Sequence, residues 1–171
     1  MEIKAVDTYE ILKYPDKRLF TKAVNVTDTE FGTESLRDVV DKMFNTMSRY
    51  KGVGLAATQV DIHKKIIVID IDDSRYVIIN PEIVDKSETL SSHREGCLSV
   101  PQVYGEVIRP EIIRVRYQDL QGKEHYIEAD GLLATCIQHE IDHLNGIVYV
   151  DRMRGLKKSM LLKKYEKINK Y

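Results

Sequence analysis

Gln138-His139-Glu140-Ile141-Asp142-His143 is the stretch on which the interpretation of this sequence depends, and it lies in an apolar run that begins at Gly131. On a helix, residues four apart lie on one face, about 6 Å apart along the axis, so His139 and His143 can bind the same metal ion. Glu140 would then be close enough to take a proton from a water molecule on the metal without being a ligand. The stretch therefore predicts a helix that holds a catalytic metal.

The alternative is a surface helix on which two histidines and a glutamate are ordinary polar residues. The neighbouring side chains are apolar nearly all round the helix, which predicts that it is buried. A buried charge without a partner is very costly, so a buried helix with these residues needs a reason, and metal coordination supplies one. The apolar neighbours are Leu132, Leu133, Ala134, Cys136, Ile137, Ile141 and Leu144.

Length and composition predict one catalytic domain over residues 1–171, with no second core. The 26 basic residues nearly balance the 27 acidic ones, so the overall charge favours neither DNA nor a membrane surface as a partner. Two cysteines are too few for a disulfide framework and indicate a reduced compartment. Residues 1–7 are too polar for a signal peptide, and no apolar run is as long as a membrane span, so we expect a cytoplasmic protein.

Apolar residues at helical spacing from Leu36 to Tyr50 predict a helix. Its start is expected between Thr27 and Glu34, and Gly52 is expected to end it. Thr27 and Glu30 have the spacing of a capping box for that start. Short β-branched runs predict the strands, with Asn80-Pro81 ending the second and Leu120–Lys123 forming a hairpin loop. Asp130 and Gly146 are expected to cap the metal helix. The predicted strands are 66–69, 76–79, 112–117, 125–127 and 147–150.

Residues 152–171 contain eight basic residues and one acidic residue, a net charge of +7. Leu156, Met160, Leu161, Tyr165 and Ile168 recur at helical spacing in this segment, which predicts a basic amphipathic C-terminal helix. A solvated basic face and a surface that binds an acidic partner such as ribosomal RNA both explain this pattern.

Two histidines do not complete a metal site, and the sequence offers few candidates for a third ligand. Tyr149 stands where the long zincin pattern has its third histidine. Cys136 precedes His143 by seven residues, about 10.5 Å along a helix, whereas ligand atoms on one ion lie within roughly 4 Å of each other, so Cys136 is interpreted as a core thiol. Cys97 remains, and Cys97 with two histidines leaves a position for water, as in catalytic rather than structural sites.

Three stretches together resemble the bacterial-type peptide deformylases: Gly52-Val53-Gly54-Leu55-Ala56-Ala57-Thr58-Gln59, Glu95-Gly96-Cys97-Leu98-Ser99 and Gln138–Gly146. Taken alone, the first stretch would indicate only a tight turn. The resemblance runs from about Tyr14 to the region of Val150. It implies an α+β fold with small mixed or antiparallel sheets around a central metal-binding helix. It also implies a hydrolase that removes the formyl group from the formyl-methionine of new polypeptides and releases formate.

By this resemblance, Cys97, His139 and His143 hold one metal ion per chain, usually Fe²⁺, which Zn²⁺, Ni²⁺ or Co²⁺ can replace. Glu140 takes a proton from water and delivers it to the leaving amine. The amide of Gln59 and the backbone N–H of Leu98 bind the developing oxyanion.

The resemblance also implies roles around this centre. The backbone at Val53 and Gly54 aligns the peptide. Glu95 pairs with Arg109 and braces the metal-binding loop, although a weak surface pair explains the sequence equally well. Thr135 and His93 are expected near the pocket for the methionine side chain.

Two other functions share these motifs. The first is an endopeptidase that uses the same helix to cleave internal peptide bonds. The second is a non-catalytic protein in which the metal only holds the fold together.

Overall fold

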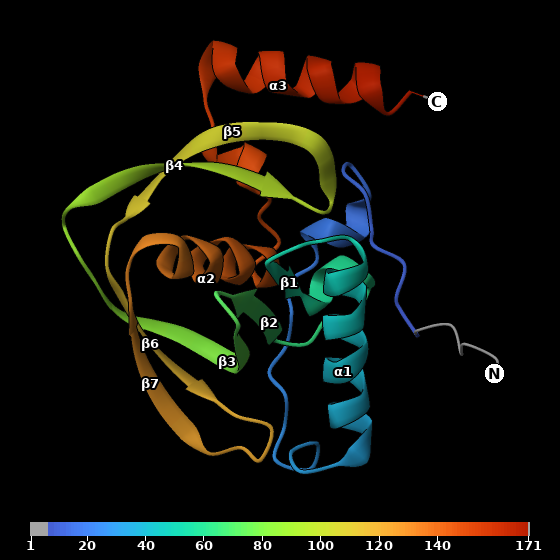
Figure 1. Ribbon diagram of the computed structural model, residues 1–171, viewed down its shortest axis with the longest axis vertical. Coiled ribbons are helices and arrows are strands. Elements are labelled where there is room, and N and C mark those ends of the chain that lie inside the picture. Colours follow the sequence, from blue (N-terminus) through green and yellow to red (C-terminus); the bar gives the residue numbers. More distant parts are fainter. Residues whose placement is uncertain (1–6, 171) are drawn as a thin grey trace.

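The computed structural model describes residues 7–170, which form an α+β fold in two sheets (Figure 1). The larger sheet is antiparallel with strand order β1-β2-β3-β6-β7, and β4 pairs with β5 as a separate hairpin. In Figure 1 helix α2 lies between the two sheets. The α-helices and strands are α1 (Glu34–Arg49), β1 (Gly54–Ala56), β2 (Ile66–Ile71), β3 (Ser74–Lys86), β4 (Leu90–Cys97), β5 (Val100–Pro110), β6 (Ile113–Gln118), β7 (Glu124–Ala129), α2 (Gly131–Leu144) and α3 (Gly155–Ile168).

Short 3-10 helices link these elements at Lys17–Phe20, Ala57–Val60 and Tyr149–Arg152. No helix among residues 7–170 has the length and apolar character that crossing a bilayer requires. Residues 1–6 and 171 of the predicted domain lie outside the described residues, as does most of the stretch judged too polar for a signal peptide.

Helix α1 confirms the predicted periodicity, and its start at Glu34 lies within the predicted range, but its capping residues differ from the prediction. Its N-cap is Thr33, whose Oγ1 accepts a hydrogen bond from the backbone N–H of Leu36 at 3.2 Å. Thr27 and Glu30 do pair, but in the preceding turn. At the other end Lys51, with φ +57°, is the left-handed residue, and Gly52 is not. The buried face of the helix is Leu36, Val40, Met43, Phe44, Thr46 and Met47.

The prediction that Asn80-Pro81 ends a strand is wrong, because β3 continues to Lys86 through a bulge. The register with β6 shifts between Ile79 and Glu82, and Asn80 takes φ +50°. A bulge accepts both a left-handed asparagine and a proline that cannot donate to the ladder. The Asn80 side chain bonds both backbone groups of Val26, at 2.8 and 2.9 Å, which fixes the bulge against the N-terminal segment.

Helix α2 is the buried central helix that the sequence predicts, and ten of its fourteen residues are buried. Asp130 occupies its N-cap position but forms no capping bond with its side chain. Gly146, with φ +76°, follows its end, and an added Cβ there would lie 2.6 Å from the carbonyl oxygen of Phe20. The predicted strand at 147–150 is wrong: the chain enters a 3-10 helix at Tyr149, because an apolar run signals burial and does not by itself specify a strand.

The β4–β5 hairpin is the part of the fold that the sequence analysis missed. Leu90, Tyr104 and Ile108 are exposed while Glu95 and Arg109 are buried, so neither strand shows a clear alternation of apolar and polar residues. Helix α3 covers β5 on the side away from α2 (Figure 1). The predicted C-terminal helix is confirmed, but its apolar pattern is only partly used: Leu161 and Tyr165 are buried, whereas Leu156 and Met160 are 74% and 60% exposed.

Candidate active site

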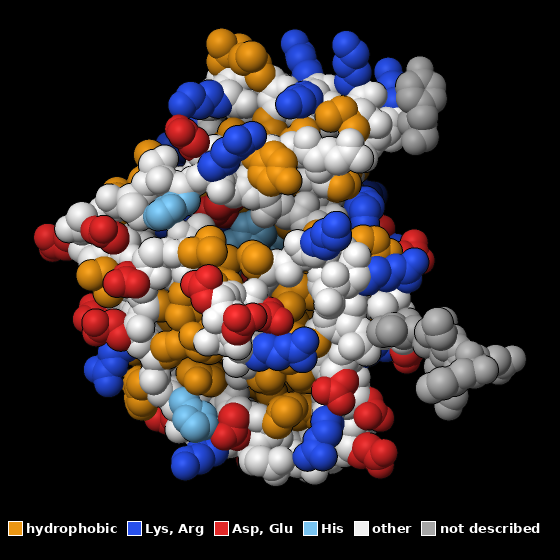
Figure 2. Space-filling model, viewed as in Figure 1, with side chains coloured by type: hydrophobic (Ala, Val, Ile, Leu, Met, Phe, Trp, Pro, Cys, Tyr) orange, Lys and Arg blue, Asp and Glu red, His pale blue; other side chains and the backbone are white. Residues whose placement is uncertain are grey.

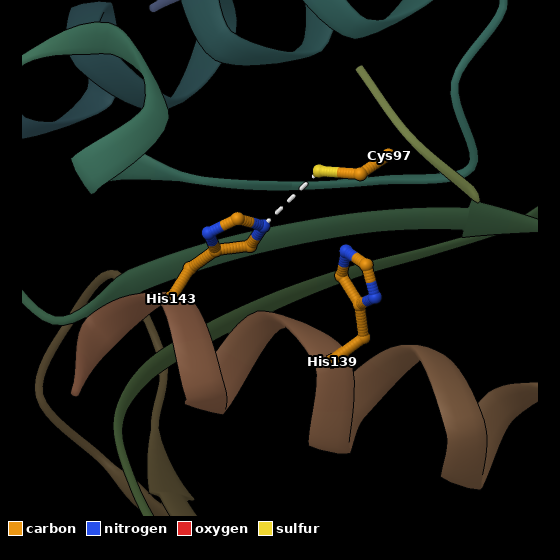
Figure 3. A group of neighbouring side chains, drawn as sticks. All are labelled: Cys97, His139 and His143. Carbon is orange, nitrogen blue, oxygen red and sulfur yellow. Dashed lines mark hydrogen bonds between the residues drawn. The ribbon is translucent and has the colours of Figure 1, made fainter. Parts of the chain in front are cut away.

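Three side chains from two distant parts of the chain meet beside α2. Cys97 ends strand β4, and His139 and His143 are one turn apart on α2 (Figure 3). The potential ligand atoms of the three residues lie within 4.8 Å of one another, and Cys97 Sγ is 3.2 Å from Nε2 of His143. One soft sulfur and two imidazole nitrogens form a donor set suited to first-row divalent ions. These three residues form a candidate metal site.

Glu95 determines which nitrogen of His139 faces this site. The Nδ1 of His139 donates to Oε1 of Glu95 at 2.8 Å, which leaves Nε2 for an ion. Arg109 donates two hydrogen bonds to the same carboxylate, from Nε to Oε2 at 2.7 Å and from Nη2 to Oε1 at 3.0 Å. Burial alone raises the pKa of Glu95, but the hydrogen bonds from His139 and Arg109 outweigh burial and hold that pKa below its usual value. The predicted Glu95–Arg109 pair is therefore present, and it is buried rather than on the surface.

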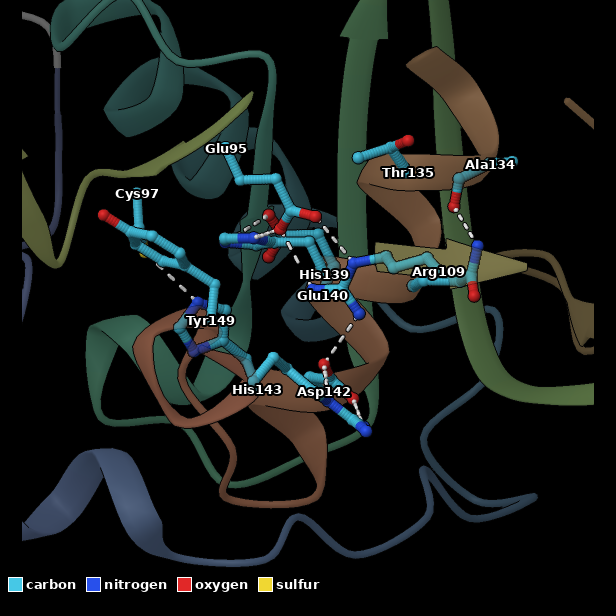
Figure 4. A network of polar contacts seen from close by, with 12 residues as sticks. Glu95, Cys97, Arg109, Ala134, Thr135, His139, Glu140, Asp142, His143 and Tyr149 are labelled. Atoms are coloured by element: carbon cyan, nitrogen blue, oxygen red, sulfur yellow. Dashed lines mark hydrogen bonds and ion pairs between the residues drawn. The ribbon is translucent and has the colours of Figure 1, made fainter. Parts of the chain in front are cut away.

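Asp142 extends this network from α2 to the segment before α3 (Figure 4). Arg109 Nη1 donates to Asp142 Oδ2 at 2.9 Å, so one guanidinium joins β4, β5 and α2. Arg152 donates to the same carboxylate with Nε and Nη2, at 3.0 and 2.7 Å. The sequence does not predict this role of Arg152, which is one of the basic residues of the segment 152–171. Nothing in the local pattern places Arg152 next to Asp142.

Tyr149 is a second residue whose position the sequence did not predict. Its ring stacks on His139, with centroids 5.8 Å apart and an interplanar angle of 27°. The ring is buried, and its hydroxyl donates to the carbonyl oxygen of Val103 at 3.3 Å. The position that holds the third histidine in long zincins is thus occupied here by a tyrosine that packs against His139. The zincin pattern itself was the signal that could have located this residue.

Glu140 is next to the candidate ligands, and it is buried. Burial raises the pKa of its carboxyl group to about 7. Its Oε1 is 4.0 Å from Nε2 of His139, and its Oε2 has no hydrogen-bond partner among residues 7–170. Gly54 gives it room, since an added Cβ there would lie 3.0 Å from Oε1. A buried carboxylate oxygen without a protein partner requires an explanation, such as a bound ion, water or ligand.

The protonation state of His143 also fits a metal ligand. Burial lowers the pKa of His143 well below its usual value. Its imidazole is therefore neutral at pH 7, the form that binds metal. Cys136, by contrast, is outside the ligand group, and burial raises the pKa of its thiol to about 12. The interpretation of Cys136 as a core thiol is consistent with both observations.

Gln59 lies in the 3-10 helix Ala57–Val60, next to the loop that carries Cys97. Its Oε1 accepts a hydrogen bond from the backbone N–H of Ala56 at 3.0 Å. Its Nε2 donates to Ser99 Oγ at 3.1 Å and contacts Cys97 Sγ at 3.5 Å. The amide is thus fixed with its N–H groups toward the loop that supplies the sulfur. One N–H of the amide is bound to Ser99, and the other, directed toward Cys97 Sγ, is the donor that an oxygen atom in the site could share.

A cavity of about 570 Å³ opens onto these residues. Figure 2 shows it as a hollow, with a histidine side chain visible at the bottom. The predicted residues Val53, Gly54, Gln59 and Leu98 line it, as do Cys97, His139, Glu140 and Thr135. His93 does not, because it lies on β4 where its Nε2 contacts Ser91 Oγ at 3.1 Å.

Comparison with known proteins identifies the family. The family model described as polypeptide deformylase matches residues 8–159. A peptide deformylase of Chromobacterium violaceum is 52% identical over 168 residues, covering 93% of this chain and 96% of that protein. Peptide deformylase 2 of Xanthomonas axonopodis pv. citri is 50% identical over 165 residues, covering 94% and 96%.

A solved structure agrees with the sequence matches. The crystal structure of peptide deformylase from Ehrlichia chaffeensis in complex with actinonin has a TM-score of 0.88 and 40% identity, covering 96% of this chain and 99% of that one. Both the sequence and the fold therefore match over nearly their whole length. The chain belongs to the polypeptide deformylase family, the hydrolases that remove the formyl group from the N-terminus of new polypeptides.

Proposed function

We propose that Cys97, His139 and His143 hold one Fe²⁺ ion per chain, which Zn²⁺, Ni²⁺ or Co²⁺ can replace. The observation that carries this proposal is the convergence of one sulfur and two imidazoles beside an unpartnered buried carboxylate oxygen of Glu140. The neutral state of His143 and the Glu95 bond to Nδ1 of His139 support it as well. When bound, such an ion supplies Lewis-acid chemistry, which lowers the pKa of a water molecule and polarises a carbonyl.

The chain's own residues then move the protons. Glu140 accepts a proton from the attacking water, whose oxygen forms a bond to the formyl carbon. As the C–N bond breaks, Glu140 delivers that proton to the amine of methionine, and formate leaves. Burial with a pKa of about 7 suits a group that must both accept and donate a proton near neutral pH.

Gln59 and Leu98 bind the oxyanion in this proposal. The formyl oxygen gains negative charge during attack, and donors fixed in advance stabilise that charge most effectively. The fixed amide of Gln59 supports its role, and Leu98 lines the same cavity. Val53 and Gly54 come where the chain enters β1, and their backbone would align the formyl-methionyl peptide along the cavity. Glu95 and Arg109 act indirectly, by holding His139 and the strand that ends in Cys97.

The decisive assay is formate release from formyl-Met-Ala-Ser under anaerobic conditions, with metal analysis of the same sample. We expect stoichiometric formate, about one metal ion per chain and no turnover after chelation. Acetyl-Met-Ala-Ser is the matched control, since it differs by one methyl group at the reacting carbon. Metal-bound protein that releases no formate would contradict the proposed chemistry, and iron-free protein with full activity would contradict the choice of Fe²⁺.

We further propose that this single catalytic domain works in the cytoplasm and docks on the ribosome through α3. The basic residues of α3 are mostly exposed and could contact RNA phosphates. Reversing Lys163, Lys164 and Lys167 to Glu should abolish co-sedimentation with ribosomes. Cosedimentation that the reversal leaves unchanged would contradict docking by α3.

A further inference from the structure

The entrance of the active-site cavity has basic side chains on two walls. One wall is the end of α1 with the N-terminal segment, which supplies Lys51 and Lys13. The other wall is the β4–β5 hairpin, which supplies Arg94. All three side chains are exposed and line the cavity, and Figure 2 shows Lys and Arg side chains on several sides of the hollow. We call these three residues the basic rim.

Tyrosine rings hold two of these cations in place. The guanidinium of Arg94 lies 5.0 Å from the ring centroid of Tyr104, and Nζ of Lys13 lies 5.7 Å from that of Tyr50. Both tyrosines also line the cavity. An aromatic ring attracts a cation but has no net charge, so it fixes the position of the charge without neutralising it.

No carboxylate of the described chain forms an ion pair with the basic rim: Glu106, opposite Arg94 on β5, pairs with Lys157 at 3.6 Å, and Glu10 acts on Lys13 only at longer range. Within residues 7–170, no carboxylate oxygen lies within 4.0 Å of a side-chain nitrogen of Lys13, Lys51 or Arg94. The acids that line the cavity, Glu95 and Glu140, are buried at its inner end, and Glu95 is bound to Arg109 and His139. The entrance therefore keeps a local positive charge in a chain whose net charge is −1. Such a cleft attracts anions and raises their local concentration.

We propose that the basic rim is a carboxylate-binding subsite for the residues that follow formyl-methionine, so that the protein prefers substrates with Asp or Glu at the second or third position. This inference rests on the proposed function, which places the formyl carbon at the candidate metal ligands. An extended peptide advances about 3.3 Å per residue, so the second and third side chains lie roughly 7 to 10 Å further out, toward the entrance. The three cations would contact them there.

Matched peptides test this subsite directly. One series is formyl-Met-Xaa-Ser-amide and the other is formyl-Met-Ala-Xaa-amide, with Glu, Gln or Lys as Xaa. The C-terminal amide removes the terminal carboxylate, which would itself bind to a basic subsite. We expect kcat/KM for formate release to be about five- to tenfold higher for Glu than for Lys in at least one series at low ionic strength. The ratio should approach one at about 0.5 M salt, because exposed charges are screened.

Charge reversal identifies the residues responsible. Arg94→Glu and Lys51→Glu should each reduce the Glu-to-Lys ratio severalfold, and the double variant should invert it. Arg114→Glu is the matched control, since Arg114 is also exposed on a strand and stacked on a tyrosine, 4.8 Å from the ring of Tyr126, but does not line the cavity. Its ratio should equal that of the unmodified protein. Because each ratio is measured within one enzyme preparation, differences in the amount of folded protein cancel.

The outcomes separate the two levels of inference. If no peptide of either series releases formate, the proposed function is contradicted. If the peptides turn over with equal kcat/KM for Glu and Lys, the subsite is overturned while the proposed function stands. A preference for Glu that persists in the double variant would also overturn it, because Lys13 alone cannot outweigh the two introduced glutamates.

Discussion

The charged residues of helix α2, Glu140 and Asp142, lie in a different environment from those of helix α3. On α2 the charges are buried, and Glu95, Arg109 and Asp142 form one hydrogen-bonded network around His139. On α3 the charges are exposed, and those that pair do so at 3.6 and 3.8 Å. Removing one member of a buried ion pair costs about 3–5 kcal/mol, whereas exposed pairs contribute about 0–1 kcal/mol. The difference indicates that the charged residues of α2 position the side chains of the active site, whereas those of α3 lie at the protein surface and add little to stability.

The largest effect is expected at Glu140. Glu140→Gln keeps the size of the side chain but cannot accept or donate the proton that hydrolysis requires. We expect a loss of about 10² to 10⁴ in kcat for formate release, with metal content unchanged. Near-normal turnover in this variant would mean that another group moves the proton. Metal analysis of the purified variant is the control, because loss of the ion would remove activity for a different reason.

Gln59→Ala should have the next largest effect. It removes a donor that is fixed by Ala56 and Ser99 before any substrate arrives. We expect kcat to fall by about 10² to 10³ through loss of oxyanion stabilisation. Gln59→Glu is the informative comparison, since it keeps the side chain's size but places a negative charge near the oxyanion. If it were as active as the unmodified protein, Gln59 would have no role as a donor.

Arg109→Met tests the buried network as a structural unit. It leaves Glu95 with one partner fewer and Asp142 with Arg152 alone, so we expect the free energy of unfolding to fall by about 3–5 kcal/mol. Denaturant titration of the metal-free protein measures this change. Arg109→Lys keeps the positive charge but cannot donate two parallel hydrogen bonds to one carboxylate, so its loss in the free energy of unfolding should be intermediate. A loss below 1 kcal/mol for Arg109→Met would show that the network is no more important than a surface pair.

The same variant predicts a change in acid sensitivity. In the unmodified protein the pKa of Glu95 is held below its usual value, so its contribution to stability is complete above about pH 4.5 and is lost as the pH falls through that lowered pKa. Without Arg109, burial should raise the pKa of Glu95. During acidification, any remaining contribution of Glu95 to stability should then be lost at a higher pH in Arg109→Met than in the unmodified protein. Unfolding measured between about pH 3 and 7 would detect the shift.

The residues of the candidate metal site could be predicted from the sequence better than their surroundings. His139, Glu140 and His143 belong to one helix, where spacing alone fixes the geometry, and the limit on ligand separation excludes Cys136. Arg152 reaches Asp142 only because the chain turns after Gly146, and no periodicity records that turn. The β4–β5 hairpin was missed for a similar reason, because buried Glu95 and Arg109 and exposed apolar residues such as Ile108 break the alternation that identifies a strand. Local motifs can thus be predicted from the sequence, whereas contacts that depend on tertiary packing cannot.

The smallest effect is expected on α3, with Lys157→Ala. Lys157 and its partner Glu106 are 76% and 64% exposed, so we expect the free energy of unfolding to change by less than about 0.5 kcal/mol. Leu161→Ala is the matched control on the same helix: Leu161 is buried next to β5, and its truncation should cost about 2–3 kcal/mol. Denaturant titration of both variants tests the difference. If Lys157→Ala cost as much as Leu161→Ala, the charges of α3 would hold the helix on the hairpin, and the contrast with α2 would fail.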